Sequence, residues 1–224
     1  MARNYGAIRG HSRFEGFSDA VFAIVLTLLI VEIKPPGSPQ GPHGYTSLVH
    51  AMMEQWREHL ALLISYVTIG TFWLQHHYTG RIYHRSDHVF GLINLLFLLA
   101  IMVVPYPIRV WSFHVGTPFE PTGAIMLTAG LAFIGVTWMM KWFYGMSGGL
   151  RVMDERLAPE FLKQMTRRYG IATLILIAAV PVAVAAPRIG VAVSVLTIAF
   201  FLIPQPTPRY RPGHEPSRDE AQAA

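Results

Sequence analysis

The chain has 224 residues, of which 52% are hydrophobic and 14% are charged, and its mean hydropathy is +0.38. An ordinary soluble domain carries roughly 25% charged residues, so the composition excludes that class and predicts an all-α, polytopic membrane protein. The net charge is +5 and there is no cysteine. The missing cysteine excludes a disulfide scaffold and cysteine-based metal or nucleophile chemistry.

Six apolar blocks follow one another, and spans of roughly 17–25 residues cross a bilayer core. The blocks are residues 17–33, 60–75, 89–108, 122–143, 169–186 and 189–204. The sequence therefore predicts a six-helix transmembrane domain over residues 1–204, which leaves no room for a separate soluble domain. Residues 205–224 are polar and rich in proline, and are predicted to form a disordered cytoplasmic tail.

The positions of lysine and arginine predict the orientation of these spans. With the N-terminus in the cytoplasm, only Lys34, Arg57, Arg109 and Arg188 of the 18 basic residues fall outside. Cytoplasmic loops carry an excess of Lys and Arg, so both termini are predicted to be cytoplasmic, with Lys141 counted on that side. The positive net charge follows from this topology and predicts no nucleic-acid partner.

The connections between spans give further expectations. Pro105 and Pro107 should kink or end the third span, because proline removes a helical hydrogen bond. Pro187 predicts a tight hairpin between the fifth and sixth spans. Residues 154–168 mix charged and apolar side chains, which is typical of a short amphipathic helix on the membrane surface. Asn94 is the strongly polar group inside the third span and is predicted to make an interhelical hydrogen bond.

A polar motif opens the first span, where Arg13 is followed by Phe17, Ser18 and Asp19. An Asp costs about 2.5–3.5 kcal/mol at the centre of a spanning helix and less near its end. An ionisable residue in a span, with an Arg nearby, is a candidate functional site. Asp19 has a second interpretation, as a cap of the helix N-terminus that faces the lipid headgroups.

This motif, at the start of the first transmembrane helix, resembles that of the transmembrane protein 175 family of lysosomal and bacterial potassium channels. The resemblance implies a polar network between Arg13, Phe17, Ser18 and Asp19 and two residues of the second helix. The matching residues are Trp73 and His77, which are four apart and so share one helical face.

The resemblance also implies that the first helices of the subunits surround the pore. The bulky apolar side chains that follow the motif would form its narrow filter, and these fall on Ile24, Leu28 and Val31, with the Thr27 hydroxyl on the pore side. Periodicity alone does not select this face, because the opposite face of the helix is equally apolar. A ring of apolar side chains opposes conduction by dewetting.

The resemblance therefore implies a potassium-selective leak channel, and for the single-repeat form a homotetramer, whose partners are potassium ions and the lipid bilayer. The single-repeat form implies a multi-pass protein of a prokaryotic plasma membrane. We expect no enzymatic activity, no cofactor and no bound metal.

Two other functions were compared with the channel. His76, His77, His84 and His88 cluster at one membrane face, and such imidazoles could bind metal or haem in a membrane oxidoreductase. No Cys or Glu-x-x-His pattern joins them, so we expect interfacial histidines and one structural residue, His77. A small secondary transporter is the other alternative, but the chain shows neither an internal repeat nor a midplane carboxylate.

Overall fold

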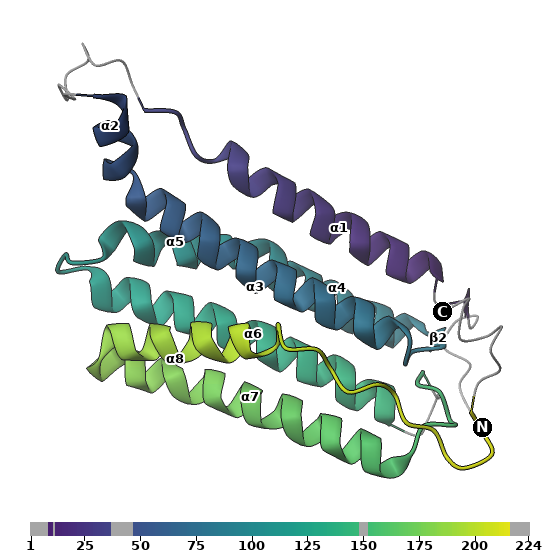
Figure 1. Ribbon diagram of the computed structural model, residues 1–224. Helices are drawn as coiled ribbons and strands as arrows, with labels where there is room; N and C mark the ends of the chain where they lie inside the picture. The colour runs from purple at the N-terminus through teal and green to yellow at the C-terminus, as the bar shows by residue number, and fades with distance from the viewer. Residues whose placement is uncertain (1–8, 11, 37–46, 148–151, 216–224) are drawn as a thin grey trace.

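The computed structural model describes residues 9–10, 12–36, 47–147 and 152–215. Within these residues the fold is a bundle of helices with one pair of two-residue strands (Figure 1). The elements in chain order are β1 (Arg9–Gly10), α1 (Ser12–Val31), α2 (Leu48–Glu54), α3 (Trp56–Gly80), β2 (Arg85–Ser86), α4 (His88–Val103), α5 (Pro105–His114), α6 (Glu120–Met146), α7 (Pro159–Ala185) and α8 (Pro187–Phe200).

The helices lie side by side, with α1 along one side of the bundle and the α7–α8 pair along the other (Figure 1). Within the described part of the chain, four helical segments are long and apolar enough to cross a membrane, and they are Phe14–Val31, His88–His114, Glu120–Met146 and Pro159–Ala185. The apolar helix α8 is shorter, with 14 residues. These findings confirm an all-helical fold with several potential membrane spans.

Every apolar block of the sequence overlaps a helix, and prolines mark two of the predicted boundaries. α4 ends at Val103 and α5 begins at Pro105, so the predicted interruption of the third span is confirmed. α7 ends at Ala185 and α8 begins at Pro187, which confirms the tight hairpin. The fixed backbone angle of proline suits the first position of a helix, so each of these prolines starts a new helix.

The predicted surface helix over residues 154–168 is wrong. α7 begins at Pro159 and continues without interruption to Ala185. Phe161 and Met165, which the sequence pattern assigned to the membrane surface, are fully buried in the bundle. Their burial against the neighbouring helices stabilises nearly three extra turns at the start of α7, because packing of an apolar face provides most of a helix's stability in a protein.

The bundle core lies between α3, α4, α6 and α7 and is rich in aromatic rings. Trp138 on α6 makes ring contacts with Phe72, Phe97 and Tyr169, which come from three other helices. Ring centroids in these pairs lie 5.4–6.1 Å apart, the range in which aromatic pairs contribute beyond their buried area. The helices that share this core form the scaffold against which α1 packs.

Backbone pairing organises the end of the bundle from which α1 starts. β1 pairs with β2 in antiparallel register, Arg9 opposite Ser86. The chain after α8 returns to the same end, where the Ala158 amide donates to the Arg209 carbonyl and the Arg211 amide donates to the Arg156 carbonyl, both at 2.8 Å. Residues 205–215 of the tail that was predicted to be disordered therefore make defined contacts here, and residues 216–224 lie outside the described part.

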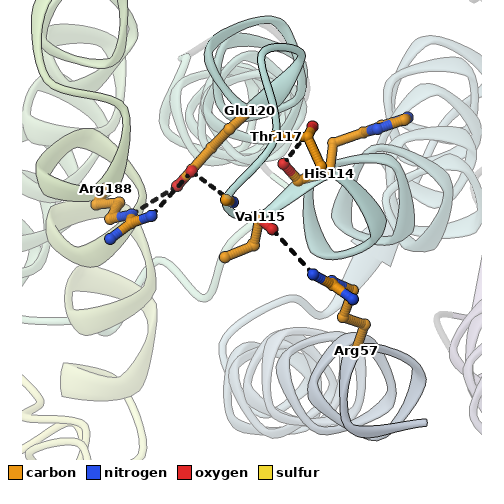
Figure 2. A network of polar contacts seen from close by, with 7 residues as sticks. Arg57, His114, Val115, Thr117, Glu120 and Arg188 are labelled. Carbon is orange, nitrogen blue, oxygen red and sulfur yellow. Dashed lines mark hydrogen bonds and ion pairs between the residues drawn. The ribbon is translucent and has the colours of Figure 1, made fainter. Parts of the chain in front are cut away.

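Polar contacts organise the opposite end (Figure 2). Glu120, at the start of α6, accepts hydrogen bonds from Arg188 of α8 and from the Gly116 amide, at 2.8–3.1 Å. Arg57, near the start of α3, donates to the Val115 carbonyl at 3.3 Å. The loop between α5 and α6 is thereby tied to both α3 and α8, and the ends of these helices are held in a common arrangement.

Candidate functional site

α1 presents an apolar face that no described residue covers. Ile24, Leu28 and Val31 are 56%, 55% and 72% exposed, and Thr27 is exposed between them. The Thr27 hydroxyl donates to the backbone carbonyl of Ala23 or Ile24, at 2.9 and 3.0 Å. Its hydrogen is therefore used within the helix, and the oxygen lone pairs are the polar feature that this face presents outward.

The opposite face of α1 is buried. Ser18 and Phe22 have no exposed surface and Leu29 is 7% exposed, and this face packs mainly against α3 and α4. At 3.6 residues per turn the three residues lie within about 40° of one another around the helix, roughly 150° from the centre of the exposed set. The structure thus resolves an ambiguity of the sequence, because the two apolar faces of α1 have different surroundings.

Part of the predicted motif network is assembled at the start of α1. The indole nitrogen of Trp73 on α3 donates to a carboxylate oxygen of Asp19 at 3.1 Å. The Trp73 ring stacks on the His77 ring with a centroid separation of 5.9 Å. Phe17 is 52% exposed and lies outside these contacts. The Arg13 side chain lies outside the described residues.

Ser18 points away from Asp19 into a second polar chain that the sequence analysis missed. Its hydroxyl accepts from the Asn94 amide at 2.9 Å and donates to the Phe14 carbonyl at 3.1 Å. The Asn94 carbonyl in turn accepts from the Lys141 ammonium at 2.9 Å. The predicted interhelical hydrogen bond of Asn94 is confirmed. Lys141, which was counted with the cytoplasmic charges, is 1% exposed inside the bundle. In the sequence, the position of Lys141 within an apolar block was the available signal of this burial.

The histidines have different surroundings from those expected. His76 is buried, and its ring stacks on Phe22 at 5.7 Å, whereas His77 is exposed apart from its contact with Trp73. His84 lies 3.4 Å from a carboxylate oxygen of Asp154. Among the residues that the structure describes, no three His, Cys, Asp or Glu side chains are grouped so that they could hold a metal ion.

Two open grooves flank α1. One lies between α1 and α3, has a volume of about 690 Å³ and contains Asp19 and Trp73 at its polar end. The other lies between α1 and the α4–α5 segment, has a volume of about 780 Å³ and is lined by Ile24 and Leu28. Arg109 and Glu32 form an ion pair in this second groove. α1 is therefore open to neighbours on both sides.

Comparison with known proteins adds evidence from outside the chain. Residues 13–105 match the family model described as endosomal/lysosomal potassium channel TMEM175. A potassium channel from Streptomyces collinus is 42% identical over 95 residues, which make up 42% of this chain and 44% of that protein. A potassium channel from Chamaesiphon minutus is 28% identical over 160 residues, 70% of this chain and 76% of that protein.

A solved structure shares the fold. It is the crystal structure of a lysosomal potassium-selective channel TMEM175 homolog from Chamaesiphon minutus, with a TM-score of 0.73 and 25% identity, and the match covers 86% of this chain and 96% of that one. The aligned segment is less than half of the Streptomyces collinus protein. The resemblance that the motif indicated is confirmed by these sequence and structure matches, and the matched proteins are named as channels rather than enzymes.

Proposed function

We propose that this chain, which resembles the TMEM175 channels in sequence over residues 13–105 and in fold over most of its length, is a subunit of a potassium-selective leak channel. Four copies surround a pore lined by α1. Each chain crosses the membrane six times, with both termini in the cytoplasm, and the channel lies in a prokaryotic plasma membrane. The names of the matched proteins support the ion, and the bacterial relatives support the location.

The observation that carries the proposal is the uncovered face of α1. A helix of this hydropathy that exposes Ile24, Leu28 and Val31 must meet lipid, another copy of the chain or a narrow pore. Symmetric copies of α1 around an axis would bring these side chains together as rings. Such rings form a hydrophobic constriction through which an ion passes only after losing part of its water, and Thr27 adds a ring of oxygen acceptors.

The motif residues have a supporting role in this proposal. The Asp19 carboxylate and the Trp73 indole join α1 to α3 at the start of the pore helix, and His77 supports the indole by stacking. Arg13 lies six residues before Asp19 in the sequence and would supply the charge that balances it. Phe17 is exposed and is available to a neighbouring subunit.

Ion flux into liposomes tests the function. The parent protein should carry potassium faster than sodium under matched gradients. Ile24→Asn should increase the flux or reduce the preference for potassium, because a polar side chain hydrates the constriction. Ile30→Asn is the matched control, since Ile30 is 59% exposed on the same helix but about 120° away from Ile24. It should leave the potassium preference close to that of the parent.

The outcome separates the channel from its alternatives. Equal effects of the two substitutions would show that position 24 has no special relation to the pore. No flux in any variant, despite confirmed insertion and folding, would favour a transporter or an oxidoreductase over a channel.

A further inference from the structure

We propose that Lys141 of α6 is a positioning residue for the pore helix: through Asn94 and Ser18, its ammonium group sets the rotation of α1 about its own axis. The rotation decides which α1 side chains face the pore. The consequence for ion selectivity rests on the proposed channel function, whereas the rotation can be measured without conduction.

The ammonium group of Lys141 is enclosed by the bundle. It is 1% exposed, and removing an ion from water costs several kcal/mol unless other groups compensate. Four aromatic rings lie around the nitrogen at 5.5–5.7 Å from their centroids, within the range of cation–π attraction. They belong to Tyr83, Phe90, Phe97 and Trp138. So complete an enclosure holds the nitrogen in one place and makes it a fixed reference point.

The hydrogen bonds that leave this point run in one direction towards α1. An ammonium group can only donate, so Asn94 must turn its carbonyl oxygen towards Lys141, at 2.9 Å. The amide of Asn94 then faces α1 and donates to the Ser18 hydroxyl at 2.9 Å. Ser18 passes its own hydrogen to the Phe14 carbonyl, at 3.1 Å. The charge on α6 thereby orients each group up to the backbone of α1.

A second contact reaches α1 one turn further along. The Lys141 nitrogen lies 3.1 Å from Nδ1 of His76, whose ring stacks on Phe22. Ser18 and Phe22 are four residues apart and lie on the same face of α1. Two contacts one turn apart resist rotation of a helix about its axis better than one contact does.

α1 depends on such contacts more than the other long apolar helices do. Only 17% of the residues in the most apolar 18-residue stretch of α1 are buried, compared with 61% in the corresponding stretch of α6. Packing against the rest of the subunit therefore constrains α1 weakly. Rotation of α1 would leave buried polar groups without their hydrogen bonds, and this cost in free energy can then decide the rotation of the helix.

The absence of cysteine from the chain makes rotation measurable. Single cysteines are introduced as Ile24→Cys and Ile30→Cys, and their reaction with a charged thiol reagent is followed in liposomes. In the parent background, position 24 should react faster than position 30, because it lies on the face of α1 that is directed towards the ion pathway. Ser18→Ala and Lys141→Met should each reduce this difference, roughly threefold to tenfold. Lys141→Arg, which keeps the charge and the donors, should preserve more of it than Lys141→Met.

Trp142→Phe is the matched control. Trp142 is the next residue of α6 and is as buried as Lys141, and its indole nitrogen donates to Thr166 of α7 at 2.8 Å, away from α1. The substitution removes that bond and should leave the reactivity pattern of the parent. Ser18→Ala and Lys141→Met should also lower the potassium-to-sodium permeability ratio, and Lys141→Arg should lower it less than Lys141→Met does. The effects of Ser18→Ala and Lys141→Met should be non-additive, because both substitutions act through one chain of contacts.

Parent-like reactivity in Ser18→Ala would overturn the proposal, even where Lys141→Met does not fold, since the serine substitution removes a single hydroxyl. A shift of the pattern in Trp142→Phe would also overturn it, because the effect would then follow general destabilisation. A parent protein that carries no potassium would refute the channel function, while the cysteine pattern would still decide the positioning role.

Discussion

Gly190 of α8 lies where this helix packs against α7 in the hairpin, and it has no space for a side chain. A Cβ atom at this position would lie 2.7 Å from three atoms of Ala183, two of them backbone atoms. Gly190→Ala should therefore push the two helices apart and destabilise the protein by about 1–3 kcal/mol. A chain of this size should then unfold several degrees lower in a thermal melt in detergent.

Gly170 of α7 is the matched control for this prediction. No atom lies within 4 Å of the Cβ position there. Gly170→Ala should stabilise by about 0.5–1 kcal/mol, because alanine loses less backbone freedom than glycine in a helix. Opposite signs are expected for the two substitutions. A loss of stability in both, of similar size, would show that the close contact at Gly190 is not the cause.

Asp154 gives a prediction for pH. Burial alone would raise the pKa of its carboxyl group, but the hydrogen bonds from Arg156 and the charges of His84 and Arg156 hold the pKa below its ordinary value of 3.8. A carboxyl group whose pKa is lower in the folded state stabilises the fold above its unfolded pKa, and this contribution is lost as the pH falls through the folded value.

Asp154→Asn should therefore lower the melting temperature at pH 7, through the loss of charge-assisted hydrogen bonds of roughly 1.5–3 kcal/mol. The difference from the parent should persist down to about pH 5 and shrink below about pH 4. Melting curves of both proteins between pH 7 and pH 3 measure it. A difference that stays constant or widens in acid would contradict the assignment of the shift to this carboxyl group.

The sequence predicted the types of residue at the site better than their partners. Ser18 and Asp19 are neighbours in the motif, yet their side chains point about 100° apart around α1, so one reaches Asn94 and the other Trp73. The apolar block around Lys141 indicated that this residue could be buried, but not which groups would surround it. Its cage is formed by rings from three separate segments, which only the tertiary fold brings together.

At the scale of elements, the helical structure of the apolar blocks was predictable, because long apolar blocks have few alternatives to a helix in a membrane. The positions at which the helices begin and end were less predictable. The charged residues at the start of α7 suggested a separate surface helix, although Phe161 and Met165 among them fit the interior of the bundle. The helix α2 was missed because it is only seven residues long and has little apolar periodicity.

The segment after α8 gives a prediction at this scale. Residues 204–215 lie along the start of α7 and the end of α3, where the Tyr78 hydroxyl donates to the Pro206 carbonyl. The Arg209 carbonyl and the Arg211 amide make two more hydrogen bonds. Truncation after Ile203 removes these three bonds and should cost roughly 3 kcal/mol, at about 1 kcal/mol for each bond. Thermal melting measures the loss.

Truncation after Glu215 is the control, because it removes only residues outside the described contacts. This shorter truncation should melt within about 2 °C of the full chain, the shift that roughly 0.5 kcal/mol produces at this size. If the two truncations had the same stability, residues 204–215 would contribute nothing to the fold.

For the whole molecule, the exposed face of α1 and the two grooves beside it leave room for neighbouring chains, in agreement with the proposed assembly of several copies. A single apolar helix at the edge of a bundle cannot enclose a pore. Related copies around an axis would enclose one, and the interface would be the same for every neighbouring pair, as closed symmetry requires. The resemblance to the TMEM175 channels implies four subunits, and native mass measurement should give that number.

Cross-linking tests the place of α1 in this assembly. Val31 is 72% exposed near the end of α1 and belongs to the proposed pore-lining face. Val31→Cys should form disulfide-linked dimers under mild oxidation, because symmetry brings copies of this position towards the axis. Cysteines bond only when their Cα atoms come within about 7 Å, so the helices must approach closely, at least transiently.

Ile30→Cys separates proximity at the axis from random collision. Ile30 is also exposed, at 59%, but lies about 100° away around the helix. In the proposed assembly it is turned away from its own symmetry copies, and should cross-link several-fold more slowly. Equal rates at the two positions would mean that α1 has no preferred face towards the axis. The pore would then have to be formed by another element, although the fold of the subunit would be unchanged.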